Sequence, residues 1–239
     1  MKTKMIYLLL LTYTFYAQEK PIYVVDYNFK TNFKILAKSF TYASTLYIKD
    51  GESPLYQIKY GDGVLRDEKK ATILNQNTSI NIEGSDNFFY WSANGNTLKY
   101  QANILFKEYF VEDSPEFQWV FTDETKTILG FLCYKAMTSF RGREYIVYYT
   151  KEASVSGAPW KFNGLPGLVL EAYSIDGEFE INATSFRTAE EDFSISDPFL
   201  GKEAISWKAY KSLYTTEYYK ALKSGDRYMP KMQFELLVD

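Results

Sequence analysis

Turn-forming dipeptides recur along this chain at intervals that suit antiparallel strands. Asp50-Gly51, Asn94-Gly95 and Asp176-Gly177 each separate two apolar segments, and Arg141-Gly142 is a weaker example of the same pattern. Such dipeptides favour β-hairpins, because glycine, asparagine and aspartate tolerate the positive φ angles that tight hairpin turns require. The chain is therefore predicted to be mainly β and antiparallel.

The segments between the turns have the composition of strands. They comprise residues 22–29, 34–48, 55–60, 78–82, 88–91, 98–111, 117–121, 127–140, 143–150, 168–174 and 178–188. In the last of these, Phe179, Ile181 and Ala183 alternate with polar residues, so one face is apolar. Residues 168–174 and 145–149 are apolar on both faces, which requires cover on both sides. A curved antiparallel sheet, or an open or partial barrel, would provide that cover.

One amphipathic helix is predicted near the C-terminus. Aromatic and aliphatic residues recur at spacings of three and four from Ile205 to Leu222, after Asp197-Pro198 and before Gly225. The helix is expected to span about residues 202–224 and to pack its apolar stripe on the sheet. A short strand at 232–238 is expected to follow.

The N-terminus has the layout of a secretory signal peptide. Lys2 and Lys4 precede a mostly apolar stretch at 5–15, and Ala17 offers a small residue for cleavage before Gln18. That stretch is shorter than the roughly 20 residues of a membrane-spanning helix. We therefore expect a signal peptide at 1–17 and a single exported domain at 18–239, with no membrane span after cleavage. The periplasm, the cell envelope and the extracellular space all remain open as its location.

Composition excludes several kinds of chemistry. The chain of 239 residues contains no histidine, which excludes Ser-His-Asp and Cys-His catalysis and histidine-ligated metals. Cys133 is the sole cysteine and lies in an apolar segment, so we interpret it as a small buried hydrophobe. The formal net charge of −3 does not indicate a nucleic acid partner. Asp62, Asp67 and Glu68 lack the spacing of a calcium loop, and no cofactor is predicted.

A turn followed directly by a buried strand stands at 164–170. Pro166 fixes φ at the second position of a turn, and Gly167 supplies a positive φ at the third, so residues 165–168 are predicted to form a type II turn. Gly164, Leu165, Pro166, Gly167 and Leu168 contain no nucleophile, acid or ligand. Their role is therefore interpreted as structural.

The stretch from Trp119 to Leu170 resembles the GLPGLI family of bacterial secreted proteins. The signature stands here as Gly164–Val169, with valine in place of the final isoleucine. The motifs that agree in order before it are Trp119, Lys126, Ile128, Gly130, 133–136, 140–143, 148–150 and 157–162. Ala158 interrupts a Gly-Pro pair that is usual in the family, and Tyr148 stands where the family often has tryptophan. The resemblance implies an exported β-rich domain whose activity is not established, and it supplies no catalytic residues.

Two groups of residues are candidates for ligand or partner binding. Arg141 and Arg143 flank Gly142, and regular alternation would send both guanidinium groups to one side, where they could hold a carboxylate or phosphate. The alternative is a solvated turn, or ion pairs with acids of the protein itself. Trp160, Lys161 and Phe162 could form a binding lip beside the turn, or could anchor that loop in the core.

These observations favour a secreted, non-catalytic envelope protein. The predicted role is binding, either of an apolar or lipid-like ligand or of an envelope protein partner. Two alternatives remain: a hydrolase using carboxylates or lysine, which needs acids that converge in a cleft, and a structural module of a cell-surface assembly. Acidic pairs such as Glu190 and Glu191 do not identify such a cleft.

Overall fold

The computed structural model describes residues 20–33, 38–60, 86–105, 107–190, 193–225 and 235–238. The predicted signal peptide at 1–17, the segment 78–82 and the first three residues of 232–238 lie outside these residues, as do Asp62, Asp67 and Glu68. In the described part of the last segment, Leu236 donates its backbone N–H to the carbonyl of Arg141.

The described chain forms one open sheet with a single helix, as predicted. The strands are β1 (Tyr23–Phe33), β2 (Lys38–Ile48), β3 (Leu55–Lys59), β4 (Asn87–Trp91), β5 (Leu98–Ile104), β6 (Lys107–Asp113), β7 (Val120–Ile128), β8 (Phe131–Phe140), β9 (Arg143–Thr150), β10 (Leu168–Ser174), β11 (Phe179–Thr188) and β12 (Ile205–Ser206). Their order across the sheet is β12-β6-β5-β4-β3-β2-β1-β11-β10-β9-β8-β7. All neighbours are antiparallel except β12 and β6.

The four predicted hairpin turns are confirmed, and two further turns were missed. Gly51, Gly95, Gly142 and Gly177 all have positive φ, and each lies between two paired strands. Leu129 (φ 51°) and Gly130 (φ 85°) form an additional turn, which divides the predicted strand 127–140 between β7 and β8. Leu105 (φ 55°) likewise divides the predicted strand 98–111 between β5 and β6. Both turns begin with leucine, an apolar residue that does not mark a turn.

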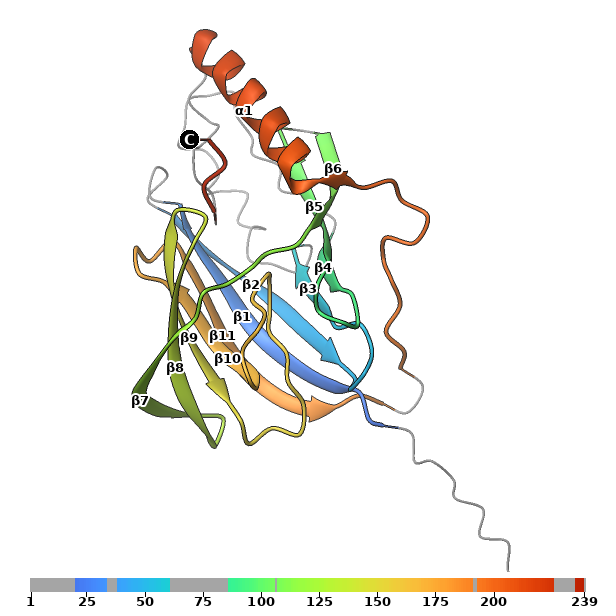
Figure 1. Ribbon diagram of the computed structural model, residues 1–239, viewed down its shortest axis with the longest axis vertical. Helices are drawn as coiled ribbons and strands as arrows, with labels where there is room; N and C mark the ends of the chain where they lie inside the picture. The colour runs from blue at the N-terminus through green and yellow to red at the C-terminus, as the bar shows by residue number, and fades with distance from the viewer. Residues whose placement is uncertain are drawn as a thin grey trace, which may run out of the picture.

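The centre of the sheet is buried on both faces, as its apolar strands predicted. In β10 the residues Leu168, Val169 and Leu170 are all fully buried, although neighbours along a strand point to opposite faces. Part of the cover comes from residues 151–167, which connect β9 to β10 and fold back across the sheet (Figure 1). Trp160 of this connection packs on Tyr145 of β9 and Phe179 of β11.

The helix α1 (Trp207–Lys223) packs at the β6 end of the sheet (Figure 1). Its buried residues are Tyr210 and Tyr214, and the Tyr210 hydroxyl donates to the backbone carbonyl of Asn103 in β5. The helix begins at Trp207 rather than near residue 202, because Ile205 and Ser206 pair with β6 and the Ser206 side chain accepts the backbone N–H of Ala209 as an N-cap. The sheet ends at β7, which lies far from α1 (Figure 1).

Among the described residues, no helix has both the length and the apolarity that crossing a bilayer requires.

Candidate functional site

The signature loop is held by its neighbours, and its turn is not the predicted type II turn. The positive φ belongs to Gly164 (80°) and not to Gly167, and the Gly167 N–H donates to the Leu165 carbonyl at 2.9 Å, which closes a three-residue turn around Pro166. Gly167 is needed for a different reason: a Cβ there would lie 2.1 Å from the carbonyl oxygen of Thr150. The prediction failed because close backbone approach, like a positive φ, selects glycine, and local sequence does not distinguish the two.

The loop also pairs with an earlier part of the same connection. Gly157 donates its N–H to the carbonyl of Gly167 and accepts the N–H of Val169. A Cβ at Gly157 would lie 2.6 Å from the Ile48 Cδ1 atom. The glycines at 157 and 167 thus allow this connection to lie against both β2 and the end of β9.

Trp160 and Phe162 are buried, so of the two roles considered from sequence, a binding lip and a core anchor, they have the second. Their rings contact each other at a centroid distance of 5.0 Å, and both contact Tyr145 and Phe179. Phe162 also contacts Phe117, which connects this core cluster to the molecular surface. The two aromatics fix the position of Lys161 between them.

Lys161 is buried between two carboxylates and several aromatic rings. Its Nζ atom donates to Glu235 and lies 3.5 Å from Oδ2 of Asp113. It also lies 3.9 Å from the ring centre of Tyr100 and 4.7 Å from that of Trp207, which are cation–π distances. Burial lowers the pKa of Lys161 below its usual value, although Glu235 and Asp113 oppose that effect.

Arg141 binds the same two acids. Its guanidinium forms a two-pronged interaction with Asp113, at 2.8 and 2.6 Å, and donates to Glu235 at 2.8 Å. The guanidinium lies 4.0 Å from the ring centre of Trp207. We call Asp113, Arg141, Lys161 and Glu235 the charged cluster; its two cations and two carboxylates balance when all four are ionised.

Arg143 does not join Arg141 at one site. Arg141 lies in the turn, with φ 45°, so regular alternation does not apply. Arg143 is buried in β9, and its Nη2 atom lies 3.4 Å from Oδ2 of Asp176. Lys135, a cation of β8, donates to Glu124 at 2.7 Å. The two guanidinium groups therefore do not share one ligand site. Each forms its own ion pairs within the protein.

The charged cluster also bears on the carboxylate hydrolase alternative. Asp113 and Glu235 converge, as that alternative requires, but both carboxylates are buried and accept hydrogen bonds from Arg141 or Lys161. Neither acid lines either pocket described below. Across the ranges that the structure describes, no group of three or more cysteine, aspartate or glutamate side chains is arranged to hold a metal ion.

Cys133 is buried as predicted. Its side chain lies within the hydrophobic core of the sheet, and burial raises the pKa of its thiol to about 11. A thiol with a raised pKa is a poor nucleophile at neutral pH.

An open pocket lies where the signature loop meets the surface. It has a volume of about 540 Å³ and is formed by the hairpin tip Gly95-Asn96, the segment 114–119 and the loop residues Asn163 and Gly164. We call it the loop pocket. Among the residues predicted from sequence as site or signature residues, only Gly164 lines it. Asn96, Phe117 and Asn163 carried no recognisable signal, because three distant segments build the pocket.

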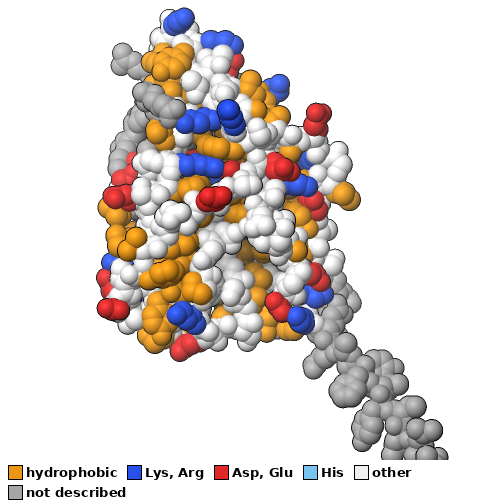
Figure 2. Space-filling model, in the orientation of Figure 1, with side chains coloured by type: hydrophobic (Ala, Val, Ile, Leu, Met, Phe, Trp, Pro, Cys, Tyr) orange, Lys and Arg blue, Asp and Glu red, His pale blue; other side chains and the backbone are white. Residues whose placement is uncertain are grey.

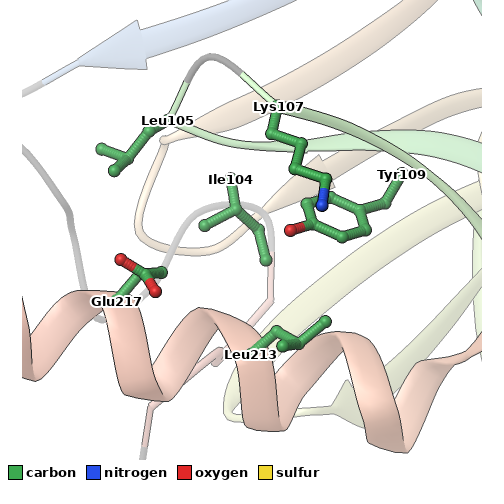
Figure 3. Close-up of a pocket in the computed structure, with 6 residues that line it drawn as sticks. All are labelled: Ile104, Leu105, Lys107, Tyr109, Leu213 and Glu217. Carbon is green, nitrogen blue, oxygen red and sulfur yellow. The ribbon is translucent and has the colours of Figure 1, made fainter.

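A second pocket of about 420 Å³ lies between α1 and the β5–β6 hairpin. Figure 3 shows Leu213 and Glu217 on the helix facing Ile104, Leu105, Lys107 and Tyr109. We call it the helix pocket. It mixes one acid and one base with apolar side chains.

Part of this chain is similar to known proteins. A family model described as "N-glycanase peptide, N-terminal domain" matches residues 96–204. A solved structure of PNGF-II in space group P21 is 21% identical with a TM-score of 0.50, and another in space group C2 is 21% identical with a TM-score of 0.49. A lipoprotein-sorting protein domain from Vibrio parahaemolyticus is 8% identical with a TM-score of 0.32, and the alignment covers 76% of this chain and 90% of that domain. No curated protein matches the chain.

The shared region is a fraction of the larger proteins. The two PNGF-II alignments cover 81% of this chain but only 32% and 33% of those chains. The chain therefore spans about a third of the length of the PNGF-II structures, and it shares a fold with the one in space group P21.

Proposed function

We propose that this chain is an exported, non-catalytic binding module of the bacterial cell envelope and that its recognition site is the loop pocket. The proposal rests on one difference between the charged cluster and the loop pocket, namely whether their polar groups are already paired within the protein. The charged cluster is closed by its own ion pairs, whereas the loop pocket is open and exposes Asn96, Glu116 and Gln118. Polar groups that remain hydrated in the free protein are available for a ligand.

Three considerations support this proposal. The matched family region, 96–204, contains every residue that lines the loop pocket except Gly95. That family is named for the N-terminal domain of an N-glycanase. The signal-peptide pattern at 1–17 and the GLPGLI-like motifs favour export.

Of the ligands expected from sequence, the loop pocket favours one with polar groups over a lipid. The face of the sheet beneath residues 151–167 is filled by Tyr145, Trp160, Phe162 and Phe179, which occupy the space that an apolar carrier would need for its ligand. The rim of the loop pocket is polar. An envelope partner that presents a polar group at its surface fits this arrangement.

A second candidate function, protein docking at the sheet edge, is favoured by the apolar start of β7. Val120 and Phe121 are 63% and 54% exposed on the terminal strand of the sheet. Leu132 of β8, which pairs with Thr127 toward the other end of β7, is also exposed. Figure 2 shows hydrophobic side chains gathered over the part of the molecule where β7 and β8 lie. An edge strand offers unpaired backbone groups to a strand of another chain.

In-cell photocrosslinking tests both candidates. A benzophenone amino acid is placed at position 118 in the loop pocket, at 120 on the β7 edge, or at 103, where an exposed asparagine of β5 serves as the control. The protein is expressed with residues 1–17, so that the exported form is sampled. The proposed function predicts an adduct from position 118 and none from 103. An adduct from 120 alone would replace it with edge docking, and equal labelling at all positions would contradict both.

A further inference from the structure

The loop pocket is lined by two aromatic side chains that are already fixed in place, and we call this pair the aromatic wall. Phe117 and Trp119 stack on each other with their ring centres 5.3 Å apart and their planes 19° apart, so each ring covers one face of the other. Phe140 also contacts Phe117, at a centroid distance of 4.2 Å. The Trp119 Nε1–H donates to the carbonyl of Asn163 at 2.7 Å, and Gly164 lies against the indole, with its missing Cβ 3.7 Å from Nε1. A ligand that stacks here need not order these side chains, which reduces the entropy cost of binding.

Asn163 holds the pocket together and has little capacity left for a ligand. Its side-chain amide donates to the carbonyl of Gly95 at 2.6 Å, and its side-chain oxygen accepts the N–H of Gly164 at 2.8 Å. These bonds join the tip of the β4–β5 hairpin to the signature loop. The rigid junction brings Asn96 to the same pocket as the aromatic wall.

The remaining polar side chains are two neutral amides, one carboxylate and the hydroxyl of Ser114. Asn96, Gln118 and Glu116 are exposed, and none of their side chains bonds another residue within the described ranges. The lining contains no lysine or arginine, which disfavours phosphate or other anions. Amide side chains provide both donors and acceptors, as a ligand with many hydroxyl groups requires.

We propose that the loop pocket binds a neutral saccharide, an inference that rests on the proposed function. A pyranose ring has one face of C–H groups, which suits the aromatic wall, and a perimeter of hydroxyl groups, which suits Asn96, Glu116 and Gln118. The volume of about 540 Å³ lies within the range of roughly 300–1,000 Å³ usual for small-ligand sites. Because the pocket is open to the surface, it would take one or two units of a longer chain.

Calorimetric titration of the full mature chain with tetra-N-acetylchitotetraose, cellotetraose and mannotetraose tests this assignment. Xylitol is the comparison ligand, since it carries hydroxyl groups without a ring face. We expect at least one oligosaccharide to bind and xylitol not to bind. The Asn96→Ala/Gln118→Ala variant should weaken binding about tenfold, because two hydrogen-bonding groups are lost. The Asn103→Ala variant should bind as the unmodified chain does.

Failure of the saccharide assignment is distinguishable from failure of the proposed function. If position 118 forms a specific crosslink but none of the three oligosaccharides binds, the ligand class is wrong and the binding site stands. If an oligosaccharide binds the double variant as tightly as the unmodified chain, the loop pocket is the wrong site for it. Equal binding of xylitol would overturn the role of the aromatic wall.

Discussion

At the residue scale, glycines show two distinct uses in this fold. Gly130 occupies a hairpin turn with φ 85°, and no atom lies within 4 Å of the position that a Cβ would take. Gly167 lacks a positive φ, but its missing Cβ makes room for the carbonyl of Thr150. The first glycine relieves backbone strain, and the second allows two backbone segments to touch.

Alanine at these two positions should separate the two uses. We expect Gly167→Ala to lower the free energy of unfolding by about 3 kcal/mol, because a Cβ at 2.1 Å from a backbone oxygen forces the loop away from β9. Gly130→Ala should cost only about 1 kcal/mol, since it adds φ strain without a clash. Urea unfolding of both variants measures the difference; equal losses would show that the loop yields to the added methyl group.

At the element scale, the charged cluster joins parts of the chain that are distant in sequence. Asp113 ends β6, Arg141 lies in the β8–β9 turn, Lys161 belongs to the β9–β10 connection, and Glu235 lies in the described C-terminal residues 235–238. Buried charges are costly to leave unpaired, so each member constrains the position of the others. The cluster therefore holds the β9–β10 connection, the sheet and the described C-terminal residues together.

Removing one charge from this cluster should cost more than removing a surface charge. We expect Lys161→Met to lower the free energy of unfolding by about 3 kcal/mol, because the buried carboxylates lose one of their two cations. Adding Glu235→Gln to that variant should recover part of the loss, since the remaining Asp113–Arg141 pair is balanced.

The control for this double-mutant cycle is Lys135→Met, which removes a lysine that pairs with the exposed Glu124. It should have a much smaller effect, as surface ion pairs contribute little. Strict additivity of the Lys161 and Glu235 losses in urea unfolding would contradict the proposed coupling.

At the scale of the whole molecule, buried tyrosines should control stability at alkaline pH. Burial raises the pKa of Tyr27, Tyr56, Tyr100 and Tyr145 above the usual value of 10, and nearby Glu235 and Asp113 raise that of Tyr100 further. A group whose pKa is raised by folding stabilises fully below its unfolded pKa, and this contribution is lost as pH rises above 10. Lys161 acts in the opposite sense, since its lowered pKa makes stability rise with pH up to about 10.5, but the tyrosines outnumber it.

We therefore expect the free energy of unfolding to fall steeply above pH 10, by roughly 1.4 kcal/mol per pH unit for each buried tyrosine. Tyr100→Phe should make this slope less steep by about 1.4 kcal/mol per pH unit, the contribution of one buried tyrosine. It should leave stability at pH 7 nearly unchanged, because the Tyr100 hydroxyl has no hydrogen-bond partner among the described residues. Urea unfolding from pH 7 to 11.5, with tyrosinate absorbance as a second readout, measures both. An unchanged slope would show that Tyr100 ionises in the folded state.

The sequence by itself determined the class of fold and most of its elements. The bounds 143–150 and 168–174 were predicted without error, since Arg141-Gly142 and Pro166-Gly167 mark where those strands begin. Local patterns also placed the four glycine turns, the burial of Cys133 and the C-terminal helix, because turn preference and hydrophobic period act over a few residues.

Only the tertiary structure decided how the charged and aromatic residues are used. Arg141 meets Asp113 across 28 residues and Glu235 across 94, and Lys161 meets Glu235 across 74. Sequence could identify Lys161 between two aromatics as unusual, but could not choose its partners among 30 acidic residues. The loop pocket likewise depends on Gly95, Trp119 and Asn163 meeting in space. Partners at such separations are selected by strand order and by the cost of leaving a buried charge unpaired. Neither factor can be inferred from a local sequence pattern.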